Sequence, residues 1–194
     1  MQHRELYRGI VPDGYIITFS DIARCKTQAS AERIAKSIYY PLGGSYSSDK
    51  MLEGNKAHKI KENEVGDWIN ELRLSYKMSD GFYLCGTIDR YYTNTKVVED
   101  YKTTGRPAEE YLKTNQVETY SFLAINNDMV VSGGRYTTID IDGNVLTQAP
   151  VEIDEAVIAE CYSKFISPRF NMIKHEIEIL RDKYVCKEVS DEPR

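Results

Sequence analysis

The stretch GTIDRYYTNTKVVEDYKTTG, residues 86–105, has the pattern of two β-strands joined by a short turn. If Asn94 and Thr95 form the centre of that turn, Asp89 on the first strand faces Asp100 directly across the hairpin. Two carboxylates then share one face of a sheet. This is an unusual place for paired acids, because strands normally carry β-branched or aromatic residues there.

Side chains alternate along a strand, so the neighbours of the two aspartates can be assigned to faces. Lys102 lies on the same face as the aspartates, whereas Ile88 and Tyr101 point the other way and can enter the core. Arg90 lies opposite Glu99 on that second face, where the two form a complementary pair.

Like charges directly opposite each other destabilise a hairpin by up to about 1 kcal/mol unless something cancels the repulsion. A divalent cation would cancel it, and carboxylate oxygens suit Mg²⁺ or Mn²⁺. Lys102 is then placed to orient a water molecule or to neutralise charge that develops on a phosphate. Alternatively, Asp89, Asp100 and Lys102 belong to a solvated hairpin face on which the charges simply balance.

The length and composition are those of one globular domain. The chain has 194 residues, of which 41% are hydrophobic, and this is enough for one well-buried core. We expect a single domain over residues 1–194, with its core at about 15–185 and peripheral segments at 1–14 and 186–194. No internal repeat or low-complexity segment is present.

Charge and hydropathy restrict the partners. The formal net charge of −5 does not attract nucleic acid, so nucleic-acid binding would need a local basic surface or a metal ion. No apolar run approaches the roughly 18 residues of a membrane span, and the first residues lack the hydrophobic centre of a signal peptide. We therefore expect a cytoplasmic, intracellular protein that does not bind membranes.

The first half of the chain predicts a strand, three helices and then the hairpin. The strand is at 15–19, and Ser20 is the expected N-cap of a helix over 21–40. Apolar residues at helical spacing predict two further helices. These lie at 48–63 and 66–77, and the hairpin strands follow at 82–89 and 96–103.

The second half predicts a helix, two or three strands and a long final helix. The first helix begins at Pro107 or Ala108 and ends near Asn127. The strands lie within 129–153 with a turn at Asp142 and Gly143. The final helix runs over 154–184, and Pro168 should break or kink it. The order predicts an α/β (or α+β) fold with a central mixed β-sheet flanked by helices.

Three short motifs in this order resemble the PD-(D/E)xK nuclease superfamily, specifically its RecB-like branch. They are GTIDR at 86–90, VVEDYKTTG at 97–105 and QVETY at 116–120, and they match a G-x-x-D strand, a D-x-K strand and a helix with Q-x-x-x-Y. The resemblance covers about 18–120 and implies a restriction-endonuclease-like core. The segment EGNKAHKIKE at 53–62 is similar to the G-x-x-x-H segment that supplies a histidine metal ligand in that branch.

The resemblance implies a role for each matching residue. His58, Asp89, Asp100 and the backbone carbonyl of Tyr101 would hold one or two Mg²⁺ or Mn²⁺ ions, with Asp89, Asp100 and Lys102 as the catalytic residues. Gln116 and Tyr120 would contact the DNA backbone or steady the lysine, because residues four apart share one face of a helix. Packing is the alternative role for Tyr120.

The segment ITFSDIARC at 17–25 is similar to the start of the iron–sulfur nucleases associated with CRISPR adaptation, in which a cysteine at the place of Cys25 ligates the cluster. Those proteins take three further ligands from a tight C-terminal cysteine group. Here only Cys161 and Cys186 occur in that region. We therefore expect no iron–sulfur cluster.

The resemblance implies a metal-dependent deoxyribonuclease that hydrolyses phosphodiester bonds, with an exonuclease acting on single strands or free ends as the expected form. A homo-oligomer or a recombination or repair partner is compatible with it. Two alternatives remain: a catalytically inactive DNA-binding module on the nuclease fold, and an interaction or scaffold protein. The complete set of Asp89, Asp100 and Lys102 argues against an inactive module, because a decayed site should have lost at least one of these residues.

Overall fold

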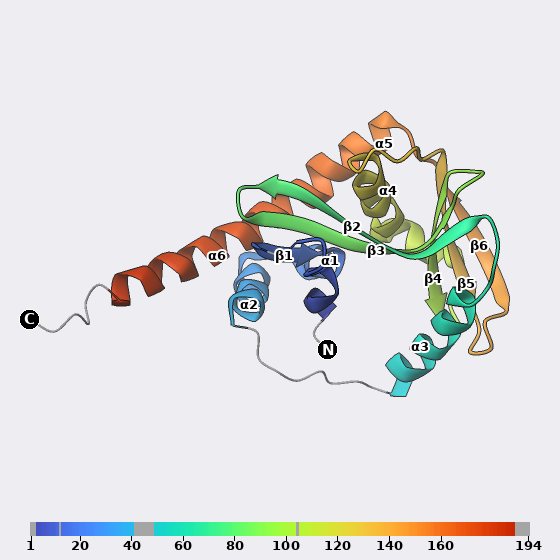
Figure 1. The fold of residues 1–194 in the computed structure, drawn as a ribbon, viewed down its shortest axis with the longest axis horizontal. Helices are drawn as coiled ribbons and strands as arrows, with labels where there is room; N and C mark the ends of the chain where they lie inside the picture. The colour runs from blue at the N-terminus through green and yellow to red at the C-terminus, as the bar shows by residue number, and fades with distance from the viewer. Residues whose placement is uncertain (1–2, 12, 41–48, 104, 189–194) are drawn as a thin grey trace, which may run out of the picture.

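Strand β3 (Phe82–Tyr92) is the central strand of a six-stranded mixed sheet in the computed structural model, which describes residues 3–11, 13–40, 49–103 and 105–188 (Figure 1). Strand β2 (Trp68–Ser79) runs antiparallel along one edge of β3. The other edge is shared by β1 (Tyr15–Thr18), which is parallel to β3, and β4 (Val97–Thr103), which is antiparallel to it. The sheet continues through β5 (Gly133–Ile139) and β6 (Val145–Val151).

This shared edge decides where the functional site can lie. Pairing of β1 with β3 reaches Thr18 and Cys85, and pairing of β4 with β3 begins at Glu99 and Arg90. Among the described residues, 86–89 therefore have no strand partner on that edge. The ends of β1 and β4 diverge there, and backbone and side-chain polar groups are left facing the opening.

The N-terminal helical region differs from its prediction. Thr18, not Ser20, is the N-cap of α1 (Phe19–Arg24), and its hydroxyl forms a capping box with Asp21. The single helix expected over 21–40 is two helices, because a second capping box at Thr27 begins α2 (Gln28–Tyr39). Two Thr caps close together favour two short helices over one continuous helix.

The helix predicted over 66–77 was wrong, because this segment is strand β2. Its apolar residues also alternate with polar ones, and this strand period extends through Leu74 and Met78, which the helical interpretation left unused. Asp80 and Gly81, the latter with φ of +74°, form the tight turn into β3. Pairing along nearly the whole length of β3 then outweighs local helix preference.

The helices around the hairpin occur where they were expected, with one interruption. Helix α3 is Asp49–Glu62, close to the predicted 48–63, although Ser48 lies outside the described residues. The helix predicted from Pro107 or Ala108 to about Asn127 is divided into the 3₁₀ helix η2 (Ala108–Thr114) and α4 (Gln116–Ile125). Asn115 separates them because it adopts the left-handed conformation, with φ of +56°, which Asn tolerates better than most residues.

The C-terminal part forms a hairpin followed by one long helical segment, as predicted. Asp154 caps α5 (Glu155–Glu160) through a 2.7 Å hydrogen bond from the Val157 N–H. A π-helical segment, η3 (Cys161–Ile166), leads into α6 (Ser167–Glu188). Pro168 thus lies just after a local rearrangement of the helix and does not end it.

Helices cover the sheet and enclose the core. Helix α4 packs on β3, β4 and β5, while α2 packs against α6, which extends away from the body in Figure 1. The N-terminal η1 (His3–Tyr7) belongs to the segment expected to be peripheral, yet Tyr7 and Val11 are buried against Cys85. In the part of the chain that the structure describes, no helix combines the length and apolar character needed to cross a membrane.

Candidate active site

A cleft of about 650 Å³ opens where β1 and β4 diverge from β3. Every residue that the sequence assigned to the site lines this cleft. These are His58, Asp89, Asp100, Tyr101, Lys102, Gln116 and Tyr120. They come from helices α3 and α4 and from the two hairpin strands, β3 and β4. The fold thus brings together motifs that are far apart in the chain.

The two aspartates meet in a different way from the one predicted. The register expected from the turn is confirmed at Arg90–Glu99 and Tyr91–Val98, but the paired ladder ends one step before Asp89 and Asp100. Asp89 Oδ2 instead accepts the backbone N–H of Tyr101 at 2.7 Å. The carboxylate therefore takes the place of a strand partner and fixes the position of β4 beside the cleft.

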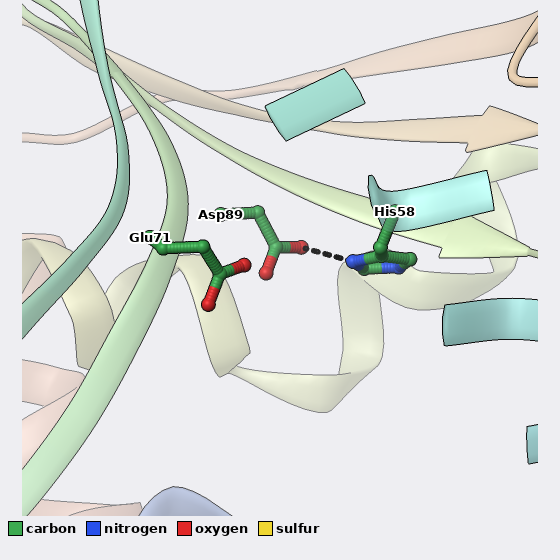
Figure 2. Close-up of side chains that lie close together, drawn as sticks. All are labelled: His58, Glu71 and Asp89. Carbon is green, nitrogen blue, oxygen red and sulfur yellow. Dashed lines mark ion pairs between the residues drawn. The ribbon is translucent and has the colours of Figure 1, made fainter. Parts of the chain in front are cut away.

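His58 and Glu71 complete a cluster with Asp89, and Figure 2 shows the three side chains turned toward one another. His58 Nδ1 on α3 lies 3.9 Å from Asp89 Oδ2. One ligand atom from each of the three residues lies within 4.8 Å of the other two. His58 thus approaches the carboxylates although it precedes Asp89 by about 30 residues.

Glu71 was missed by the sequence analysis, because the segment around it was interpreted as a helix. In the structure it falls between Asn70 and Leu72, whose partners on β3 flank Asp89. Its backbone has φ of +50°, a conformation that is uncommon for a residue other than glycine. A strand interpretation of β2 would have placed Glu71 opposite Asp89.

Two side chains from different elements hold Lys102: Asp100 on β4 and Gln116 on α4. Its Nζ lies 2.5 Å from Asp100 Oδ2 and donates to Gln116 Oε1 at 2.7 Å. Gln116 Nε2 in turn donates to the Tyr120 hydroxyl at 2.9 Å. Because the amide nitrogen is engaged with Tyr120, the amide oxygen must face the lysine. The spacing of Gln116 and Tyr120 along α4 therefore orients the Lys102 ammonium.

Gly86 explains how α4 comes so close to the strand. A Cβ at this position would lie 2.8 Å from Leu123 Cδ1 and 2.9 Å from Tyr120 Cε1, closer than real contacts allow. The glycine of the G-x-x-D motif thus admits the helix that carries Gln116 and Tyr120. Tyr120 is 7% exposed, so it both packs in the core and reaches the cleft with its hydroxyl.

Burial dominates the electrostatics of the cluster. It raises the pKa of Asp89 well above its usual range, and the nearby Asp100 charge raises it further. Burial also raises the pKa of Asp100, although the Lys102 ammonium opposes this effect, and it raises the pKa of Glu71. Burial lowers the pKa of His58 and so favours the neutral imidazole that binds metal ions.

The other face of the hairpin carries a separate buried network. Arg90 and Glu99 are opposite each other as predicted, but they do not form the expected pair. Arg90 forms an ion pair with Glu64 at 2.9 Å, and Glu99 forms one with Arg135 at 2.6 Å. The prediction failed because two other segments supply better-placed partners: Glu64 lies between α3 and β2, and Arg135 lies on β5.

The cysteines that bear on the iron–sulfur question have different neighbours. Cys25 Sγ lies 3.7 Å from the Arg169 carbonyl oxygen, and Cys161 Sγ lies 3.8 Å from Thr119 Oγ1. The side chain of Cys186 is outside the described residues. The expectation that the protein holds no iron–sulfur cluster therefore stays a prediction.

Solved exonuclease structures share this fold. The alkaline exonuclease LHK-Exo from Laribacter hongkongensis, in complex with dAMP, superposes with a TM-score of 0.55 at 19% identity, over 94% of this chain and 98% of that one. Another structure of that enzyme has a TM-score of 0.51 at 17% identity, over 87% and 93%. A protein from Eubacterium rectale to which exonuclease activity is ascribed has a TM-score of 0.54 at 9% identity, over 91% and 85%.

The fold is therefore the mixed α/β fold of these nucleases, with a six-stranded sheet flanked by helices. No family model matches the chain, and no curated protein sequence matches it. At such low identity the likeness extends to the fold alone, and the chemistry depends on the residues of the cleft.

Proposed function

We propose that this protein is a Mg²⁺- or Mn²⁺-dependent deoxyribonuclease of the RecB-like branch of the PD-(D/E)xK superfamily. The observation that carries the proposal is the meeting of Asp89, Asp100, Lys102 and His58 in one cleft. These residue types supply oxygen and imidazole ligands together with a fixed ammonium. A fold that solved exonucleases share supports the same conclusion.

The residues present fit a divalent cation. Asp100 Oδ2 is buried and, apart from its ion pair with Lys102, has no hydrogen-bond donor of suitable geometry among the described residues. His58 and Asp89, with Glu71 beside them, offer further ligand atoms within 4.8 Å of one another. Hard oxygen ligands with one imidazole suit Mg²⁺ or Mn²⁺. We assign His58, Asp89, Asp100 and the Tyr101 carbonyl as ligands, and Glu71 as an additional one.

A bound ion would polarise the scissile phosphate and lower the pKa of a water molecule. The protein itself contributes a fixed positive charge, because Gln116 and Asp100 hold the Lys102 ammonium in the cleft. This charge would stabilise the negative charge that develops on a phosphate bound in the cleft. Asp89 holds the two strands of the site together through the Tyr101 N–H, so the ligand atoms do not need to be reorganised when substrate binds.

We further propose that the substrate is DNA with a free end or a single-stranded segment, and that the protein is an exonuclease. The net charge of −5 gives no overall attraction for a long duplex. The cleft is of the size of a small-ligand site and suits a terminal nucleotide. A neighbour of the same fold has been solved in complex with dAMP, a mononucleotide.

The test is cleavage of four DNA substrates, linear and circular in single- and double-stranded form, each with Mg²⁺, with Mn²⁺ and with EDTA. Mononucleotides should be released from linear DNA with either ion, circles should remain intact, and EDTA should abolish product formation. A Lys102→Ala preparation purified in parallel controls for contaminating nucleases.

Two outcomes would contradict the proposal at different levels. Cutting of circular DNA would replace the exonuclease assignment with an endonuclease. Absence of product with both ions, from a folded preparation, would favour the inactive DNA-binding module. Absence of both cleavage and ion-dependent stabilisation would favour a scaffold, because a ligand that binds only the native state must raise its melting temperature.

A further inference from the structure

Helix α4 begins without the side-chain cap that helices normally have. Its first residue is Gln116, and the preceding Asn115 adopts a left-handed conformation and makes no capping hydrogen bond with its side chain. The first N–H groups of a helix have no partner within the helix and require one from elsewhere. At this position the requirement matters, because Gln116 is the residue that holds Lys102.

The hydroxyl of Tyr136 on strand β5 supplies the missing partner. It accepts the backbone N–H of Gln116 at 2.9 Å and that of Val117 at 3.0 Å. It also lies 2.9 Å from Thr114 Oγ1, and since Thr114 Oγ1 donates to the Tyr111 carbonyl, the Tyr136 hydroxyl is the donor in that contact. One donor and two acceptor sites are the full capacity of a hydroxyl.

The rest of the Tyr136 side chain is fixed as firmly as its hydroxyl. The residue is fully buried, and on β5 it is the register partner of Asp100 on β4. The same tyrosine is therefore tied to the strand of the catalytic carboxylate and to the start of the helix that presents Gln116. Its position sets the distance between these two elements, across which Lys102 is held.

We propose that Tyr136 is a positioning residue for Lys102 and that it acts through Gln116. By capping α4 it fixes the backbone of Gln116, whose amide oxygen receives the Lys102 ammonium at 2.7 Å. The inference rests on the proposed nuclease function, and it adds a residue that lies outside the three sequence motifs. Tyr136 itself does not touch the substrate or the ion.

Tyr136→Phe keeps the buried ring and removes only the hydroxyl. Small misplacements of a catalytic group lower the rate without equal loss of binding, so kcat should fall by about tenfold, while KM should change by less than about twofold. In the Gln116→Ala background the same substitution should change kcat no further, because the group through which Tyr136 acts is already gone. An additive loss in the double variant would overturn the proposal.

Tyr91→Phe is the matched control. Tyr91 is also a buried tyrosine of the sheet, 5% exposed, and its hydroxyl donates to the Val130 carbonyl at 2.7 Å, away from the cleft. It loses one buried hydrogen bond but should keep the wild-type kcat. A loss of kcat in Tyr91→Phe equal to that in Tyr136→Phe would reduce the role of Tyr136 to general stability and overturn the proposal.

A measurement without DNA separates this inference from the proposed function. Backbone amide hydrogen exchange, followed by NMR in Tyr136→Phe, should accelerate at Gln116 and Val117 and remain unchanged along β3. Unchanged exchange at both amides would refute the capping role even if the enzyme is active. Accelerated exchange in a protein that cleaves no DNA would leave the cap established and place the failure in the proposed function.

Discussion

Two adjacent acids on β4, Glu99 and Asp100, are equally buried and yet have opposite environments. Each is 1% exposed. Glu99 accepts hydrogen bonds from Arg135, Thr137, Tyr92 and Tyr101 at 2.6 to 2.8 Å. Asp100 forms an ion pair with Lys102 through Oδ2, and this oxygen has no hydrogen-bond donor of suitable geometry among the described residues.

The pKa values of Glu99 and Asp100 are shifted in opposite directions because their hydrogen-bond donors differ, although both groups are buried. Although burial raises the pKa of Glu99, the hydrogen bonds from Arg135 and Thr137 hold it below the usual range. Burial raises the pKa of Asp100 and, with the Asp100 charge beside it, that of Asp89. The Glu99 network is a satisfied part of the scaffold, whereas the cleft holds carboxylates that a cation would stabilise.

The largest expected effect is the loss of catalysis when the cleft is altered. Lys102→Ala or Asp100→Ala should lower kcat by about a thousandfold or more, equivalent to about 4 kcal/mol of transition-state stabilisation. The reason is that the charge held at the phosphate, or its ligand, is removed. Steady-state cleavage of linear DNA measures the effect, and thermal melting should show an intact fold.

Lys164→Ala is the control for that experiment, because the ion pair of Lys164 with Glu160 lies on an exposed helix surface and contributes little. It should cleave like the wild type. Near wild-type cleavage by a folded preparation of Lys102→Ala would show that this cleft is not the active site.

The Glu99 network should respond to a conservative change with a loss of stability and no loss of metal binding. Glu99→Gln leaves the Arg135 guanidinium without its carboxylate and should lower the free energy of unfolding by about 3 kcal/mol, as for other broken buried pairs. Urea unfolding measures the change. Stabilisation by Mn²⁺ should persist, because the substituted side chain lies on the opposite face from the ligands.

Glu110→Gln provides the comparison, since Glu110 also pairs with an arginine, Arg106, but the two side chains are 45% and 72% exposed. Its loss should be below about 1 kcal/mol. Equal losses in both variants would mean that the buried network around Glu99 is no more important than a surface pair.

The metal affinity should depend on His58 through its proton. His58→Ala should weaken Mn²⁺ binding by about tenfold and reduce the slope of log Kd against pH by up to about one proton below pH 6.5, because wild-type imidazole must be neutral to bind. Calorimetric titration over a pH series measures both. Burial lowers the pKa of His58. The pH dependence that His58 contributes to the Mn²⁺ affinity is therefore expected at a lower pH than for a free imidazole.

The carboxylates of the cluster also bind protons, so the difference between wild type and His58→Ala is the informative quantity. An unchanged slope with unchanged affinity would exclude His58 as a ligand. Lys59→Ala, at the neighbouring position of α3, is the control and should leave the slope as in the wild type.

The smallest expected effect is at Asp89, where a substitution should raise the free energy of unfolding, whereas the substitution at Glu99 should lower it. Because the pKa of Asp89 is raised in the folded protein, its contribution to stability is present below the unfolded pKa and is lost as pH rises through the folded one. Without divalent ions at neutral pH, Asp89→Asn should therefore stabilise the protein by about 1 kcal/mol, or about 2 to 4 °C in Tm. The Asn oxygen can still accept the Tyr101 N–H.

Melting curves in EDTA measure this effect, and added Mn²⁺ should narrow the difference by stabilising the wild type alone. A lower Tm for Asp89→Asn in EDTA would show that the ionised cluster is satisfied without a cation. The comparison between the two faces of the hairpin would then lose its physical basis.

Local patterns predicted the hairpin well because its determinants lie close together in the chain. The register at Arg90–Glu99 follows from the turn position, and the proximity of Lys102 and Asp100 follows from the two-residue period of a strand. The helix over 66–77 was wrong for the opposite reason. Apolar residues of β2 fit both periods, and only pairing with β3 decides between them.

The mixed fold, the hairpin with its two aspartates and lysine, and the four-residue spacing of Gln116 and Tyr120 on one helix face all follow from local sequence patterns. Turn-forming residues and residue periodicity are local features, so they can be recognised in the amino-acid sequence. Tertiary structure alone decided that Glu71 reaches Asp89, that His58 comes within 3.9 Å of the same carboxylate, and that Tyr136 caps α4. These contacts depend on how β1 and β4 diverge along β3, and no period in a single segment encodes the meeting of distant segments.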